Sequence, residues 1–245
     1  MLKLGRVIKP KKEVITLQIE EFLLKDKMWQ DPVEVKLSVE TEKFACGGFR
    51  DAFIAEAISG ISPRKYVLKR YKGETVNSII ELFESTEIHT RKSVQMNALA
   101  QNFAKALVQE KPEDFGDSFN YIKVYFAKHN DDCVTLEPYL DGPFRKFVNN
   151  NGDIIPLDDE EASLKAQCFC HYTYVKSGKQ LMVLDIQGVG YNLCDPEIAS
   201  TNLKDVDNER ILFCSGNLSL QAIETFLIFH SCNKYCKLLD IVEQE

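Results

Sequence analysis

The spacing of apolar residues changes from a period of two to a helical period near residue 75, and this change limits the folds open to the chain. Before it, VEVKLSVE at 33–40 alternates apolar and polar residues, and DAFIAEAI and KYVLKRY read as two further strands. After it, the segment 75–109 carries its apolar residues on one helical stripe: Met96, Leu99, Ala100, Phe103, Ala104, Leu107 and Val108. We therefore expect an α+β fold of two lobes.

The rest of the chain supplies further elements. Two strands joined by the polar turn KHNDD are predicted for YIKVYF and CVTLEPYL. A loop is expected for LDGPFRKFVNNNG, a helix for EEASLKAQCFCHYTYV and a buried strand for LMVLDI. The last helical region is SLQAIETFLIFHSCNKYCKLLDIV.

Composition excludes several classes of protein. A chain of 245 residues that is 44% apolar can bury a core, and a net charge of −7 argues against a nucleic-acid partner. The start lacks the apolar segment of a signal peptide, and no run approaches the roughly 18 apolar residues that span a bilayer. Eight cysteines are too sparse for a disulfide scaffold. We expect a cytoplasmic protein without membrane insertion.

Residues 1–28 are polar and mixed in charge, with KPKK as their basic run. This composition favours a solvated N-terminal leader, with a docking segment as the alternative.

A glycine turn, GGFR, lies between two predicted strands and contains Gly47, Gly48 and Arg50. Glycines let a backbone approach a ligand closely and leave N–H groups free for an anion, and an arginine adds charge. A hairpin turn without a ligand explains the glycines equally well.

Lys69 lies inside the strand pattern YVLKRY. If its face of the strand is the inner one, the ammonium needs an anionic partner, because burial of an unpaired charge is costly. On an exposed face it needs none. A glycine turn followed by a lysine on the next strand but one is the arrangement by which protein kinases bind the phosphates of ATP, and this interpretation predicts carboxylates for magnesium downstream.

The stretch LMVLDIQGVGYNLCDPEI supplies such groups in Asp185, Gln187 and Asp195. Magnesium binds a few oxygen ligands together with phosphate and water, so one carboxylate and the amide suffice, and the other carboxylate can orient a hydroxyl. Gly188 and Gly190 permit a turn that brings Asp195 back beside Asp185. Alternatively, Asp195 starts a turn and Asp185 caps a buried backbone group.

HSCNKYC contains three candidate zinc ligands, His230, Cys232 and Cys236. The two cysteines are four residues apart and share one face if the helix is regular. A structural site needs a fourth ligand, and CFCH offers His171, Cys168 or Cys170. Reduced cysteines in the core are the alternative.

Taken in order, these motifs resemble the alpha-type atypical protein kinases, the group of the myosin heavy chain kinases, elongation-factor kinase and the kinase domains fused to certain channels. The resemblance runs from about Trp29 to about Leu239 and rests on ACGGFRDAF, YVLKRY, VQMNALAQNFAKAL, LEPYLDGPFRKFVNNNG, CHYTYV, LDIQGVGYNLCDPEI and FHSCNKYC. It implies a two-lobed atypical kinase fold with a zinc-supported C-terminal lobe. The kinase domain would span 29–245, with the lobes meeting near residues 137 and 138.

The family's site residues carry over by position. The resemblance implies a phosphate loop of Gly47, Gly48 and Arg50, a phosphate contact by the catalytic Lys69, and an adenine contact by Glu137. It implies Asp185 as the catalytic aspartate, Gln187 and Asp195 as magnesium ligands, and His171, His230, Cys232 and Cys236 as the ligands of a structural zinc. The implied activity is transfer of the γ-phosphoryl group of Mg-ATP to a serine or threonine of a protein substrate, with threonine favoured and autophosphorylation expected.

One segment departs from the family pattern. FCSGNLSLQAI keeps Gly216 and Asn217 but has Cys214, Ser219 and Ala222 where the family commonly has glycines. The departure bears on the substrate side of the cleft. A pseudokinase that binds ATP or acts as a scaffold is therefore one alternative function, and a kinase of small molecules or lipids is another.

Overall fold

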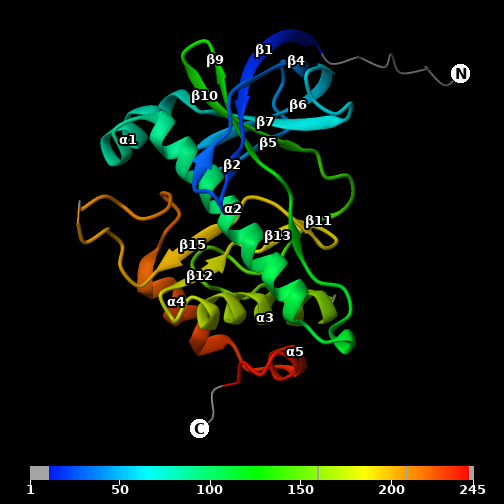
Figure 1. Ribbon diagram of the computed structural model, residues 1–245, viewed down its shortest axis with the longest axis vertical. Helices are drawn as coiled ribbons and strands as arrows, with labels where there is room; N and C mark the ends of the chain where they lie inside the picture. The colour runs from blue at the N-terminus through cyan, green and yellow to red at the C-terminus, as the bar shows by residue number, and fades with distance from the viewer. Residues whose placement is uncertain (1–10, 159, 208, 243–245) are drawn as a thin grey trace, which may run out of the picture.

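The computed structural model describes residues 11–158, 160–207 and 209–242, which form two lobes stacked along the long axis of the molecule (Figure 1). The strand-rich N-terminal lobe lies at the top of the view and the helix-rich C-terminal lobe lies below it. Helix α2 (Thr86–Glu110) runs from one lobe into the other. The expected α+β class with two lobes is confirmed.

The N-terminal lobe is built on a seven-stranded sheet in the order β4-β1-β9-β10-β7-β6-β5. Its strands are β1 (Lys12–Glu20), β4 (Val33–Glu40), β5 (Ala45–Cys46), β6 (Arg50–Ser59), β7 (Lys65–Tyr71), β9 (Tyr125–His129) and β10 (Asp132–Pro138). Strand β4 pairs with β6 as well as with β1, so six of the strands close into a ring. The ring encloses the core of this lobe, to which Leu17, Leu37, Leu68 and Leu136 belong.

The expected solvated leader at 1–28 is wrong for residues 12–20, because these form β1. Ile15, Leu17 and Ile19 of β1 alternate with exposed residues and are buried, and the strand pairs with both β4 and β9. The short strands β2 (Phe22–Leu23) and β3 (Met28–Trp29) form a hairpin before β4. Residues 1–10 of the expected leader lie outside the described residues.

The helix expected over 75–109 is two helices. Helix α1 (Gly73–Phe83) ends at Glu84, whose backbone is left-handed with φ 68°, and α2 follows. The Ser85 hydroxyl caps α2 by accepting a hydrogen bond from the Ile88 N–H at 3.1 Å. The predicted stripe is largely buried, although Val108 is exposed.

The strand expected for YIKVYF also divides, because the chain crosses between the lobes there. Strand β8 (Asn120–Tyr121) pairs with β14 in the C-terminal lobe, whereas β9 begins at Tyr125 and belongs to the N-terminal sheet. The predicted turn between β9 and β10 is confirmed.

The C-terminal lobe combines helices with two small sheets. Its elements are η1 (Glu113–Phe115), β11 (Phe144–Lys146), α3 (Glu160–Lys176), β12 (Leu181–Leu184), β13 (Gln187–Val189), β14 (Asn192–Leu193), β15 (Glu197–Ser200), α4 (Ser219–Phe229) and α5 (Lys234–Leu238). The sheets are β11-β13-β14-β8 and β12-β15. Strand β11 lies inside the segment expected as a loop. The last helical region is broken between Phe229 and Lys234.

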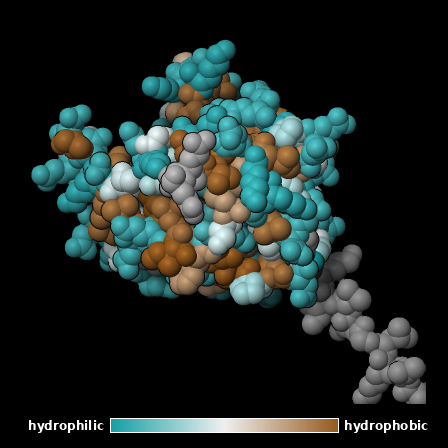
Figure 2. Space-filling model, turned by 90° about the horizontal axis from the view of Figure 1, so that it is seen from below, coloured by the Kyte–Doolittle hydropathy of each residue, from teal (hydrophilic) through white to brown (hydrophobic). Residues whose placement is uncertain are grey.

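The surface of the C-terminal lobe is mixed. Seen from below, brown apolar areas lie among hydrophilic side chains (Figure 2). Several large apolar side chains of α4 are exposed, Ile228 and Phe229 most of all. None of the helices formed by the described residues has the length and apolar character needed to cross a membrane.

Candidate active site and metal centre

Lys69 lies where the two lobes meet. Its Nζ is 3.0 Å from Glu137 Oε1, on the neighbouring strand β10, and 3.1 Å from Asp195 Oδ1 of the C-terminal lobe. The lysine side chain is 14% exposed, and the ammonium has the anionic partners that burial demands. By alternation it lies on the face of β7 opposite Leu68, so it points out of the ring of strands and toward the C-terminal lobe. Burial lowers the pKa of Lys69, but the charges of Asp195 and Glu137 outweigh this effect and raise the pKa above its ordinary value.

The two carboxylates beside Lys69 differ in access to solvent. Glu137 is buried, and burial raises its pKa against the lowering effect of Lys69. Asp195 is 65% exposed, and the charge of Lys69 lowers its pKa, so Asp195 is an ionised carboxylate that a ligand can reach. Because the side chain of Glu137 is bound to Lys69, the adenine contact implied for this residue stays a prediction.

Asp185 directly follows β12, which ends at Leu184, so the expectation that it lies within the strand is wrong. Its backbone is left-handed, with φ 54°, and this bend turns the chain out of β12. Asp185 Oδ1 lies 2.6 Å from Lys146 Nζ, and Oδ2 accepts a hydrogen bond from Gln187 Nε2 at 2.7 Å. Burial raises the pKa of Asp185, and the charge of Lys146 opposes that rise.

Gln187 joins the two aspartates. Besides contacting Asp185, its Nε2 donates to the backbone oxygen of Asp195 at 3.3 Å. The hairpin of β13 and β14 makes this possible: at Gly188, a Cβ atom would lie 2.0 Å from the Asn192 oxygen, and Gly190 has φ 57°. The predicted return of Asp195 to the neighbourhood of Asp185 is therefore confirmed, and the three polar residues form one group.

The glycine turn connects β5 to β6. The Gly47 N–H donates to the Arg50 oxygen at 2.8 Å, which closes the turn, and both glycines are exposed. The Arg50 side chain points into the protein, where its Nη2 donates to the Tyr71 hydroxyl at 2.6 Å. Its charge contributes to lowering the pKa of Asp195, so the guanidinium acts electrostatically on the group around Lys69.

Two residues of this site were missed in the sequence. Lys146, which contacts Asp185, lies on β11, where the register pairs it with Gln187. Glu197 begins β15, and burial together with the charges of Asp195 and Asp185 raises its pKa to about 8. An added Cβ at Gly216 would lie 2.2 Å from the Glu197 carboxyl carbon, so a side chain at 216 would have to displace that carboxyl group. The sequence signal was the short spacing of Glu197 from Asp195.

The segment that departs from the family pattern keeps a compact structure. Asn217 Oδ1 accepts from the N–H groups of Ser200 and Ser219, which ties β15 to the start of α4. Ser219 has φ 58°, a conformation that glycine adopts at less cost. Cys214 and Ala222 are buried in the core.

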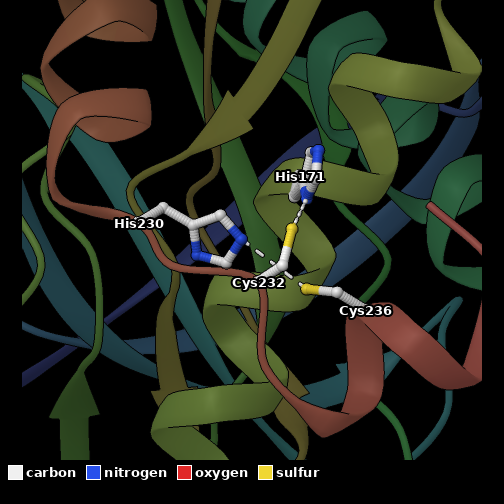
Figure 3. A group of neighbouring side chains, drawn as sticks. All are labelled: His171, His230, Cys232 and Cys236. Atoms are coloured by element: carbon white, nitrogen blue, oxygen red, sulfur yellow. Dashed lines mark hydrogen bonds between the residues drawn. The ribbon is translucent and has the colours of Figure 1, made fainter. Parts of the chain in front are cut away.

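His171, His230, Cys232 and Cys236 converge in the C-terminal lobe (Figure 3). They come from α3, the segment after α4, and α5, and their ligand atoms all lie within 4.8 Å of one another. Cys232 Sγ is 3.5 Å from His171 Nδ1, and Cys236 Sγ is 3.6 Å from His230 Nε2. Tetrahedral zinc with its usual bonds separates ligand atoms by about 3.3–3.8 Å, so the two imidazoles and two thiols fit this ion.

The expectation that both cysteines lie on one helix is wrong, because Cys232 precedes α5. The four-residue group contains His171 and neither Cys168 nor Cys170, which agrees with the ligand set implied by the resemblance.

Comparisons with known proteins show which family the chain resembles. The alpha-kinase family model matches residues 45–236. The chain is 33% identical over 181 residues to human transient receptor potential cation channel subfamily M member 6, a match that covers 72% of this chain and 9% of the channel. It is 32% identical over 209 residues to myosin heavy chain kinase B of Dictyostelium discoideum, covering 84% of this chain and 26% of that protein. The chain thus spans about a tenth to a quarter of the length of these curated relatives.

Solved structures match over nearly their whole length. The alpha-kinase domain of myosin heavy chain kinase A in complex with AMP gives a TM-score of 0.75 at 26% identity, covering 93% of this chain and 99% of that one. The same domain in complex with ADP gives a TM-score of 0.76 at 26% identity, covering 95% of this chain and 98% of that one. With a family model that matches most of its length, the chain belongs to the alpha-kinase family.

Proposed function

We propose that this chain is a serine/threonine protein kinase that transfers the γ-phosphoryl group of Mg-ATP to a protein hydroxyl, with threonine favoured by the resemblance. The observation that carries the proposal is the contact of Lys69 with Asp195 beside the group of Asp185 and Gln187. A cation from one lobe and carboxylates from the other are what binding and transfer of a phosphoryl group require. The complexes of a related kinase domain with AMP and ADP support nucleotide binding.

Each residue has a proposed part in the reaction. Lys69 and Arg50 offset phosphate charge, and the exposed Gly48 leaves the backbone of the glycine turn open to the approach of a phosphate. Asp195 and the amide oxygen of Gln187 would hold magnesium, which neutralises charge on the phosphates when bound. Asp185 orients the acceptor hydroxyl and accepts its proton, and the charge of Lys146 favours the ionised form of that carboxylate.

Zinc has a different proposed role. The group of two histidines and two cysteines joins α3 to the segment around α5, so a bound ion would connect parts of the chain far apart in sequence. Such a site contributes to the free energy of folding and takes no part in the transfer.

The test is transfer of labelled γ-phosphate from Mg-ATP to a threonine-bearing protein substrate, beside an Asp185→Ala control. Label on the substrate or on the enzyme itself, with wild type alone, supports the proposal. ATP binding without transfer would instead favour a nucleotide-binding or scaffolding module. ATP turnover that depends on an added metabolite would favour a small-molecule kinase. The protein target and the predicted cytoplasmic location need separate experiments.

A further inference from the structure

A row of polar side chains crosses the interior from the glycine turn to the C-terminal lobe. It starts at Arg50, continues through Tyr71 of β7 and His89 of α2, and ends at Ser215, in the segment that departs from the family pattern. The three contacts measure 2.6 Å, 2.7 Å and 3.2 Å in that order. The row therefore connects a strand end, a helix and a loop that are distant in sequence.

His89 joins the two ends of this row as a neutral ring. His89 is 4% exposed, and burial, followed by the charges of Arg50 and Lys92, lowers its pKa to about 3. The ring is therefore neutral near pH 7, with one donor and one acceptor nitrogen. Arg50 donates to the Tyr71 oxygen, and His89 bonds to the Tyr71 hydroxyl through Nδ1 and to the Ser215 hydroxyl through Nε2, since each hydroxyl can donate or accept.

Thr90 completes the environment of Arg50. Its hydroxyl donates to the Thr86 oxygen at 2.7 Å, so it can accept from Arg50 Nη2, which lies 3.2 Å away. The guanidinium carbon also lies 4.5 Å from the centre of the Tyr71 ring. The direction in which Arg50 points thus depends on Tyr71 and on α2.

Ser215 is connected through its neighbours to Asp195, one of the residues proposed to hold magnesium. It precedes Gly216, which packs against the carboxyl group of Glu197, and Glu197 is two residues from Asp195. A displacement of Ser215 would therefore reach the loop that carries Asp195 through van der Waals contact.

We propose that His89 is a positioning residue. It fixes the position of Arg50 relative to the segment 214–217, and so fixes the two sides of the nucleotide site relative to each other. This inference rests on the proposed function for its kinetic consequences. His89 touches neither phosphate nor acceptor and acts through Tyr71 and Ser215.

The hydrogen bonds of His89 can be tested separately from the packing of its ring. The His89 ring lies 4.6 Å from the Phe83 ring and 6.2 Å from the Phe49 ring between centroids, contacts that a phenylalanine would keep. His89→Phe therefore removes the hydrogen bonds and retains an aromatic ring of similar size. Ser215→Ala removes the last contact alone.

The experiment compares wild type, His89→Phe, Ser215→Ala and the double variant in phosphoryl transfer and in ATP binding by calorimetry. We expect His89→Phe to lower kcat/KM for ATP by about tenfold, the size of one or two hydrogen bonds. Ser215→Ala should have little further effect in the His89→Phe background, because the row is already broken. His89→Gln, which can donate toward Ser215, should recover part of the loss. His129→Phe, which alters a histidine that contacts Thr16 of β1, is the matched control.

Additive effects of the two substitutions, or unchanged kcat/KM in His89→Phe, would overturn the inference. A wild type that transfers no phosphate would contradict the proposed function instead. In that case the dissociation constants for ATP carry the same test. Non-additive weakening supports the role of His89, and equal affinity in all four proteins contradicts it.

Discussion

Lys69 and Asp195 come from different lobes, and their charged groups lie 3.1 Å apart. The same ammonium also contacts the buried Glu137, so two carboxylates compensate one cation. Asp195 is the solvent-accessible one of the two, so under the proposed function it is the carboxylate that binds magnesium, and Glu137 holds Lys69 in place. The first prediction follows from these different roles of the two carboxylates.

Lys69→Met should lower phosphoryl transfer by at least about 10²-fold, because charge stabilisation of the phosphates is lost. The fold should persist, since burial already raises the pKa of Glu137 and the unpaired carboxyl can take up a proton. Transfer assays and thermal melting measure the two effects. Lys65→Met, at the exposed start of the same strand, is the matched control. A fully active Lys69→Met protein would exclude the assigned site.

Lys146→Met should raise the pKa of Asp185, because the ion pair at 2.6 Å opposes the effect of burial. Transfer requires ionised Asp185 in the proposed mechanism, so the acidic limb of the pH–rate profile should move to higher pH. The profile of kcat between about pH 5 and 9 measures this shift. Lys176→Met, which removes a surface pair with Glu110, should leave the limb where it is. An unmoved limb in Lys146→Met would argue against Asp185 as the proton acceptor.

His89 should make the folded state sensitive to acid. Its folded pKa of about 3 lies below the ordinary value of 6.5, so its contribution to stability is complete above pH 6.5 and is lost as the pH falls toward 3. Between pH 7.5 and 5, wild type should lose about 2 kcal/mol more of its free energy of unfolding than His89→Phe. Urea unfolding at the two pH values measures the difference. Equal losses would mean that folding does not lower the pKa of His89.

Cys236→Ser should reduce zinc content and lower the melting temperature, because structural metal binding is part of the folding free energy. Metal analysis of the purified protein, together with melting curves in the presence and absence of a chelator, tests this outcome. Cys133→Ser replaces a buried thiol of the N-terminal lobe and should leave the zinc content unchanged. A wild type that carries no metal and has the same stability with chelator would contradict a zinc site.

Local spacing was enough to predict one part of the site. Gly188 and Gly190 permit a tight hairpin after Gln187, and such a hairpin brings Asp195 back toward Asp185. The zinc ligands in HSCNKYC are likewise close in sequence. Both predictions rest on geometry confined to fewer than about a dozen residues.

Contacts between distant segments could not be predicted in this way. Lys146 reaches Asp185 because β11 pairs with β13, and nothing near Lys146 in the sequence specifies that register. His89 lies among polar residues of α2, so its burial depends on Tyr71 and Ser215, which other segments supply. The alternation of β1 was present in the sequence, but its many charged residues led to the interpretation as a leader.

The ring of strands in the N-terminal lobe has a consequence for recombinant fragments. The family match begins at residue 45, and a fragment cut near that point would lack both β1 and β4. Strands β6 and β9 would then each present a row of unpaired amides, and such edges recruit strands from other molecules. Aggregation of a shortened protein would therefore indicate that the ring of strands is open, and would say nothing about the catalytic centre. A recombinant fragment that stays soluble should begin before Lys12.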